Sequence, residues 1–539
     1  MRERPPLTPD TPSPADQPRD FELEEQDFGD VEGAPVHIDA PARVVCDERG
    51  VIRSGRLKGL SMWGAIVVLA WPVLLESFLN ALVGLVDTVV AARISTAATD
   101  AIGVASYFQW FMGMLTIALG VGATALISRA VGKGRTAFAG VVFGQVVTIG
   151  ILMGTLTGAV IFALAPQIAA FLRLEPGGEA FGYTVEYLRI VSCAVPAVTI
   201  LFGGIACSRG VGESLKPMLI MAIVNAINVA LTFVLAGVDL AYTPPGADEP
   251  LFAIPALLDE GLGVRGIALG TCIAWWCGAI LIVALMFRGI SGVRLRPARL
   301  RPHKSTIRRL VRVGVPNFFE TAGMWLGNFI VFTFLGLAGA EVLFGAHVVA
   351  IRAESFSFMP GFGMAIAAST LVGQYLGAKR PDLARLAIRR CTLVACAIMG
   401  TLGLAYITLP DLIVSIYSEQ PEHRELVPPL LITCGIIQIP FAIAIVVRGA
   451  LRGAGDTKVV MCITWFAVWG VRLPLAWLGS GVDLPLPFID ATLPNPAPLA
   501  QFGIGPLLGL WIGLCSELLL RPFFFIARYL TGRWAEIRV

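Results

Sequence analysis

Apolar runs of 20 residues or more recur along this chain between residues 62 and 530. A helix rises about 1.5 Å per residue, so a run of this length matches the roughly 30 Å hydrocarbon core of a bilayer. Apolar residues make up 56% of the sequence and charged residues only 15%, which excludes an ordinary soluble domain. The runs lack the alternating pattern of an outer-membrane barrel strand, and we therefore expect an all-α membrane protein.

Glycine, proline and charged residues divide the apolar sequence into twelve predicted transmembrane helices. The predicted spans are residues 62–92, 101–127, 138–165, 184–207, 216–237, 264–287, 310–337, 345–375, 388–409, 427–451, 459–479 and 504–530. Lysine and arginine gather in alternate connections, and the richest of these joins the sixth span to the seventh. The positive-inside rule then predicts a multi-pass protein of the plasma (inner) membrane with both termini in the cytoplasm.

The segments outside the spans have a different composition. Residues 1–58 contain the proline-rich stretch MRERPPLTPDTPSPADQPRD and the acidic stretch FELEEQDFGD, with too little apolar surface to fold. We expect a disordered cytoplasmic tail there, and a second, short cytoplasmic tail at residues 531–539. No apolar run follows the first arginines, so a cleaved signal peptide is not expected. The ten cysteines form no CxxC pair and predict neither a zinc site nor a disulfide framework.

Three short motifs occur twice, at nearly constant spacing. WPVLLES (71–77) resembles VPNFFET (315–321), SRAVGKGR (128–135) resembles GQYLGAKR (373–380), and SRGVGESLK (208–216) resembles LRGAGDTK (451–458). The offsets are 244, 245 and 243 residues. We therefore expect two six-helix lobes, 59–287 and 310–530, joined by a basic linker at 288–309. A parallel repeat of this kind is typical of transporters that work by alternating access.

Two carboxylates lie within the first predicted span. Glu76 and Asp87 are 11 residues apart, about three helical turns, so they share one face of the helix with Asn80. An ionised carboxylate that faces lipid costs several kcal/mol, so this face is expected to line a bundle interior or an aqueous cavity. Binding of a cation is one interpretation, and a hydrogen bond that packs one helix on another is the other.

Several of these motifs resemble the multidrug and toxic compound extrusion (MATE) transporters. The resemblance rests on VDTVVAARIS after the proline of the first span, on SRAVGKGR, on residues 346–380 and on RGAGDTK (452–458), and it extends over residues 62–530. It implies twelve helices in two lobes, a central cavity, and export of amphiphilic organic cations in exchange for protons or sodium ions. No cofactor other than the coupling ion is implied, and we expect a monomer in contact with membrane lipid, not nucleic acid.

The same resemblance implies a set of site residues. Asp87 matches the first-helix carboxylate of the family, and Asn228 and Thr271 match further ligands of the coupling ion, which is a possible sodium ion. Thr232 stands where one branch has an aspartate, so either Glu76 compensates for the missing charge or the affinity and identity of the ion differ from that branch. Glu320 matches a seventh-helix glutamate of another branch, while the tenth helix has Phe441 near the position of that branch's aspartate. The chain thus mixes two branch patterns.

Aromatic and amide side chains near the carboxylates are candidates for binding a flat lipophilic cation. Cation–π attraction contributes about 0.5 to 2 kcal/mol per ring. The expected substrate-binding residues are Asn80, Gln109, Trp110, Phe318 and Trp325.

Three other classes of membrane protein are alternatives to an exporter. A lipid-linked oligosaccharide flippase is the main alternative, but it is expected to carry several cations in its cavity, whereas the arginines here are mostly assigned to loops. An enzyme is not expected, because no clustered catalytic motif such as HExxH or GxSxG is present. A channel differs from a carrier only in its kinetics, so the sequence leaves it open.

Overall fold

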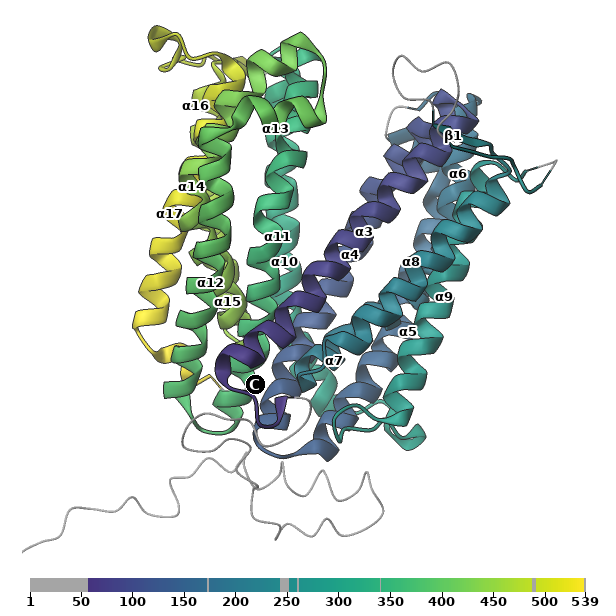
Figure 1. Ribbon diagram of the computed structural model, residues 1–539, viewed down its shortest axis with the longest axis vertical. Helices are drawn as coiled ribbons and strands as arrows, with labels where there is room; N and C mark the ends of the chain where they lie inside the picture. Colours follow the sequence, from purple (N-terminus) through teal and green to yellow (C-terminus); the bar gives the residue numbers. More distant parts are fainter. Residues whose placement is uncertain are drawn as a thin grey trace, which may run out of the picture. The chain divides into compact units, whose positions relative to one another are not determined.

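The computed structural model describes residues 57–171, 174–242, 252–258, 261–339, 341–486 and 491–537. Most of the predicted N-terminal tail, residues 1–56, lies outside this range, as do the last two residues of the predicted C-terminal tail. The described chain is built almost entirely of helices (Figure 1). The prediction of an all-α membrane protein is confirmed, with the addition of two short hairpins.

The first half forms an N-terminal bundle. Its helices are α3 (Met62–Ile94), α4 (Thr96–Gly132), α5 (Thr136–Phe171), α6 (Glu179–Ser192), α7 (Val195–Val211), α8 (Leu215–Ala236) and α9 (Val264–Arg288). Strands β1 (Leu240–Tyr242) and β2 (Phe252–Ile254) pair antiparallel between α8 and α9. The short 3-10 helix η3 (Pro297–Leu300) follows in the basic linker.

The second half forms a C-terminal bundle. Its helices are α10 (Lys304–Leu337), α11 (Glu341–Gly377), α12 (Pro381–Thr408), α13 (Pro410–Tyr417), α14 (Pro421–Ala454), α15 (Thr457–Trp465), α16 (Leu473–Ser480) and α17 (Pro506–Leu530). A π-helical segment, η4 (Phe466–Arg472), joins α15 to α16. Strands β3 (Leu484–Leu486) and β4 (Ala491–Leu493) form the second hairpin, and the 3-10 helices η5 (Ala500–Phe502) and η6 (Arg533–Ala535) flank α17.

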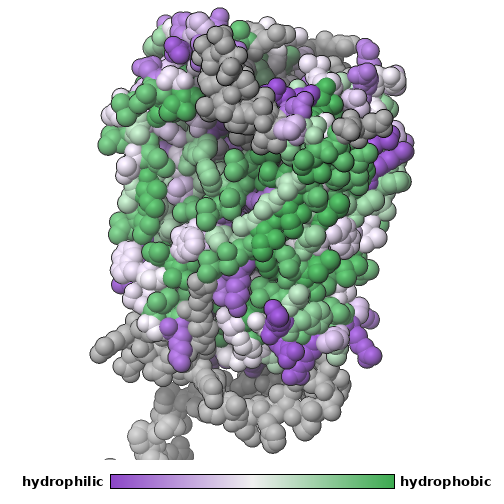
Figure 2. Space-filling model, turned by 45° about the vertical axis from the view of Figure 1, so that its right-hand side comes forward, coloured by the Kyte–Doolittle hydropathy of each residue, from purple (hydrophilic) through white to green (hydrophobic). Residues whose placement is uncertain are grey.

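The helices have the length and composition to cross a bilayer. In the part of the chain that the structure describes, eleven spans meet this condition, and the pair α6 and α7, bent by 53°, makes a twelfth. Figure 2 shows a broad band of hydrophobic residues with hydrophilic residues toward both ends. Large apolar side chains such as Leu156, Leu393 and Ile436 are exposed on α5, α12 and α14. This is the surface expected of a multi-pass membrane protein, because lipid replaces water around the apolar band.

The two bundles contact each other at one end. We call it the basic end, because α4, α7, α11 and α14 finish there beside Arg129, Arg209, Lys379 and Arg452. Thr370 Oγ1 of α11 donates a hydrogen bond to the carbonyl of Arg209 (3.1 Å), and Arg129 Nη2 of α4 donates one to the carbonyl of Ala454 (2.9 Å). From this end the two groups of helices diverge toward β1 and α13 (Figure 1).

Paired glycines allow the close approach at the basic end. A Cβ atom on Gly132 of α4 would lie 2.0 Å from the carbonyl oxygen of Gln374, and one on Gly377 of α11 would lie 2.3 Å from that of Arg129. Gly132 and Gly377 occupy the same position in the repeated motif SRAVGKGR and GQYLGAKR, and so do Arg129 and Gln374. The contact is therefore reciprocal, as expected for parallel repeats related by a two-fold axis.

Helix α3 belongs to both bundles. Its beginning, including Met62, Ile66 and Leu69, packs in one hydrophobic cluster with residues of α11, α12 and α14. Its far end, including Val90 and Ala91, packs with residues of α4, α6 and α9. The helix that carries Glu76 and Asp87 thus connects the contact at the basic end to the interior of the N-terminal bundle.

Candidate functional site

A row of polar side chains joins α3 to α8 inside the N-terminal bundle. Asn225, Asn228 and Thr232 recur at helical spacing on α8, and all three are buried. Asn225 Nδ2 donates a hydrogen bond to Asn80 Oδ1 (3.2 Å), and Thr232 Oγ1 donates one to Asp87 Oδ1 (3.4 Å). The polar face predicted for the first span therefore lies against α8, and Asp87 itself is half-buried.

Helix α9 completes this group. Asn228 Nδ2 donates a hydrogen bond to Thr271 Oγ1 (3.0 Å), while Asn228 Oδ1 is buried and has no hydrogen-bond partner in the part of the chain that the structure describes. The close packing of α9 on α8 depends on glycine, since a Cβ atom on Gly270 would lie 2.8 Å from the backbone nitrogen of Thr232. We call Asp87, Asn228, Thr232 and Thr271 the N-bundle oxygen cluster.

The N-bundle oxygen cluster offers a carboxylate, an amide oxygen and two hydroxyl oxygens. Such oxygens are the ligands that hard cations prefer in proteins. None of the ion pairs between described residues involves Asp87. A negative group without a basic partner inside a membrane bundle suits a proton or a small cation.

Glu76 and Glu320 lie elsewhere, in two equivalent ion pairs. Glu76 Oε2 of α3 is 2.6 Å from Arg209 Nη2 of α7, and Glu320 Oε2 of α10 is 2.8 Å from Arg452 Nη2 of α14. Glu76 aligns with Glu320, and Arg209 with Arg452, in the repeated motifs. Each bundle therefore uses the same contact between its first and fourth spans. Because arginine already compensates both carboxylates, neither belongs to the oxygen cluster around Asp87.

Loss of either ion pair is expected to destabilise the fold. Removing one partner of a buried pair leaves the other charge uncompensated and costs about 3 kcal/mol. We expect Glu76→Gln and Glu320→Gln to lower the melting temperature of the purified protein in detergent. Glu320→Gln should have the larger effect, because Glu320 is fully buried and Arg448 Nη1 also lies 3.8 Å from its Oε1 atom. Glu419→Gln, at an exposed glutamate, is the control; equal melting temperatures for all four proteins would contradict this role.

The residues predicted to bind substrate are placed as follows. Asn80 accepts the hydrogen bond from Asn225, and Phe318 packs edge to face against Phe319 with ring centroids 5.6 Å apart. Trp325 is half-buried on α10. Gln109 and Trp110 fall in α4, at positions whose side chains lie outside the described residues. Their role in substrate binding stays a prediction.

Sequence reasoning missed the buried arginines. Arg448 falls inside the predicted span 427–451 and Arg452 just beyond its end, and both lie within α14. Arg472 and Arg521 lie inside the C-terminal bundle on η4 and α17. The assignment of most arginines to loops is therefore wrong for this bundle. A signal was present for Arg209 and Arg452, because each precedes the first glycine of a repeated RGxG motif.

Twelve spans in two equivalent bundles define an integral membrane protein with a parallel internal repeat, of the class typical of alternating-access transporters. The MatE family model matches residues 72–234 and 316–478, once in each bundle. The chain belongs to the MatE family.

Curated relatives and solved structures agree with this assignment. The chain is 27% identical to a "Probable multidrug resistance protein NorM" of Thermotoga maritima, over 87% of this chain and 93% of that protein. It is 25% identical to "Multidrug resistance protein PmpM" of Pseudomonas aeruginosa, over 84% and 90%. The fold is similar to that of the Vibrio cholerae MATE transporter VcmN in the bent form, with a TM-score of 0.74 at 18% identity over 87% of this chain and 97% of that one.

Proposed function

We propose that the chain is a secondary active exporter of amphiphilic, cationic organic compounds, driven by inward movement of protons or sodium ions. The coupling ion binds at the N-bundle oxygen cluster, with Asp87 as the charged ligand. Substrate and coupling ion compete for the same negative charge, because either one compensates it and both together are disfavoured. The two fluxes are thereby linked in opposite directions.

The observation that carries the proposal is that the N-bundle oxygen cluster contains both a carboxylate, on Asp87, and an amide oxygen, on Asn228, that is available as a ligand. Asn228 Oδ1 is buried and accepts no hydrogen bond from a described residue, and it lies one helical turn from Thr232, which contacts Asp87. The repeat offers no second copy, since Val331 occupies the position of α10 that is equivalent to Asp87. Coupling is thus assigned to the N-terminal bundle.

The names of the relatives support the substrate class. Two of the proteins that the chain resembles over more than four fifths of its length are named multidrug resistance proteins. With the basic end in the cytoplasm, as the positive-inside rule expects, the bundles contact each other on the cytoplasmic side. The two bundles diverge from there toward the opposite side, to which an exported compound is released (Figure 1).

A lipid-linked oligosaccharide flippase is the alternative. One observation favours it: the buried arginines of the C-terminal bundle offer positive charge to a diphosphate. The relatives' names favour the exporter, and the following test separates the two.

The test is dye movement in everted membrane vesicles that contain the protein. A pH gradient and a sodium gradient are imposed separately, and the accumulation of ethidium is followed by fluorescence. We expect accumulation under one of the two gradients, which identifies the coupling ion. No accumulation of ethidium or of any other lipophilic cation under either gradient would overturn the proposal and favour the flippase.

A further inference from the structure

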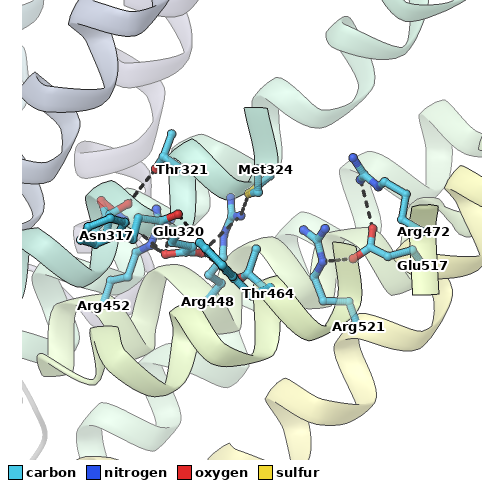
Figure 3. A network of polar contacts seen from close by, with 12 residues as sticks. Asn317, Glu320, Thr321, Met324, Arg448, Arg452, Thr464, Arg472, Glu517 and Arg521 are labelled. Carbon is cyan, nitrogen blue, oxygen red and sulfur yellow. Dashed lines mark hydrogen bonds and ion pairs between the residues drawn. The ribbon is translucent and has the colours of Figure 1, made fainter. Parts of the chain in front are cut away.

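The C-terminal bundle contains a buried cluster of charges with more positive than negative groups (Figure 3). Four arginines and two glutamates form its ion pairs: Arg448, Arg452, Arg472 and Arg521 with Glu320 and Glu517. Both glutamates are fully buried. An excess of buried charge is costly in a membrane bundle unless an opposite charge compensates it.

Glu517 of α17 is shared by two guanidinium groups. Its Oε2 atom is 3.0 Å from Arg472 Nη2, and its Oε1 atom pairs with Arg521 Nε. Arg472 Nη1 donates a further hydrogen bond to Asn328 Oδ1 (2.7 Å). Arg472 and Arg521 are 92% and 97% buried, and Arg472 Nε and Arg521 Nη2 have no hydrogen-bond partner among the described residues.

Arg448 is the least satisfied of the four arginines. The oxygens of Glu320 already accept hydrogen bonds from Arg452, Thr464 and Asn317. Arg448 Nη1 is 3.8 Å from Glu320 Oε1, beyond hydrogen-bonding distance, and its hydrogen bond goes to Met324 Sδ at 3.5 Å. A thioether sulfur is a weak acceptor, so this buried guanidinium lacks a strong one. Figure 3 shows Arg448 between the Glu320 pairs and the Glu517 pairs.

One further carboxylate does not remove the excess. Glu354 of α11 lies close enough to Arg472 to interact with it electrostatically. Even if Glu354 is ionised, four guanidinium groups face three carboxylates among the described residues. Among the described residues, at least one positive charge is left without a carboxylate.

The two bundles have opposite polarity at equivalent places. Gly270 packs against Thr232, and Gly513 packs against Ala476 in the same way, so the two contacts are equivalent in the repeat. Arg472 lies four residues before Ala476, as Asn228 lies four residues before Thr232, and is therefore the counterpart of Asn228. At this position the N-terminal bundle has a neutral amide, whereas the C-terminal bundle has a guanidinium group. The repeat therefore does not duplicate the cation site.

We propose that the C-terminal bundle binds a monovalent anion, either chloride or the carboxylate of an organic compound, between Arg448 and Arg521. Arg448 Nη1 donates to a thioether sulfur, and Arg521 Nη2 has no acceptor among the described residues. The binding itself does not depend on transport.

The test measures thermal unfolding of the purified full-length protein in detergent, at constant sodium concentration. Sodium gluconate is replaced stepwise by sodium chloride in one arm, and by sodium benzoate in the other. A ligand that binds only the folded state raises the melting temperature with the logarithm of its concentration. We expect a rise of roughly 1–3 °C for wild type at the end of each replacement series. The rise should be lost in Arg448→Gln and in Arg521→Gln.

The controls make each outcome decisive. Because the anion-dependent shift is measured within each variant, an altered starting stability does not obscure it. Arg424→Gln, at an exposed arginine of α14, should keep the wild-type shift. A response to chloride alone assigns the site to a halide, and a response to benzoate alone assigns it to an organic acid. No response of wild type, or an unchanged response in both Arg448→Gln and Arg521→Gln, overturns the proposal, and ethidium export would be unaffected by that result.

Discussion

Asp87→Asn is expected to reduce gradient-driven ethidium export at least about 10-fold, the equivalent of about 1.4 kcal/mol of lost coupling. Asparagine keeps the shape of the side chain and an oxygen that accepts the hydrogen bond from Thr232. It carries no negative charge, so neither the coupling ion nor a cationic substrate is held by charge at this position. The measurement is ethidium accumulation in everted vesicles with the amount of protein in the membrane matched.

Asp100→Asn is the matched control for this variant. Asp100 is exposed near the beginning of α4, so its replacement should leave export at the wild-type level. Retention of gradient-driven export by Asp87→Asn would move coupling away from the N-bundle oxygen cluster.

Gly132→Ala is expected to slow export by weakening the contact at the basic end, without affecting the ion site. The added methyl group would lie 2.0 Å from the carbonyl oxygen of Gln374, and a backbone atom cannot turn aside as a side chain can. Overpacking of this kind costs about 1–3 kcal/mol, which shifts a two-state equilibrium roughly 5- to 150-fold against contact at the basic end. We expect export to fall by a similar factor, measured with the same vesicle assay.

Gly113→Ala is the control for Gly132→Ala. It lies in the same helix, and a Cβ atom there would meet nothing within 4 Å. Alanine also favours a helix over glycine, so this variant should keep full export. Full export by Gly132→Ala would show that the contact between Gly132 and Gln374 is not part of the cycle.

The fold was largely predictable, because the length of an apolar run and the period of a repeat are written directly in the sequence. The twelve spans and the two bundles follow from those features. The 53° bend between α6 and α7 and the π-helical segment Phe466–Arg472 were not predicted, since both depend on how one helix packs on its neighbours. The β1–β2 and β3–β4 hairpins are too short to give a period of their own.

The candidate site was predictable only in part. Asp87, Asn228, Thr232 and Thr271 were grouped by resemblance, and the structure brings their side chains together. Glu76 shares a helix face with Asp87, but periodicity gives no information about what lies opposite that face. Arg209 of α7 lies there instead of a cavity, and the partner of Glu320 likewise comes from a distant helix, α14. Such pairs depend on contacts between segments more than 130 residues apart in sequence.

The central claim is that Asp87 exchanges a coupling cation for the substrate. The most direct measurement uses proteoliposomes of the purified protein, in which an ethidium gradient is imposed and the opposite movement of protons or sodium ions is recorded. We predict cation movement driven by ethidium with wild-type protein and none with Asp87→Asn. Equal cation movement with both proteins, or ethidium movement without cation movement in wild type, would contradict the account.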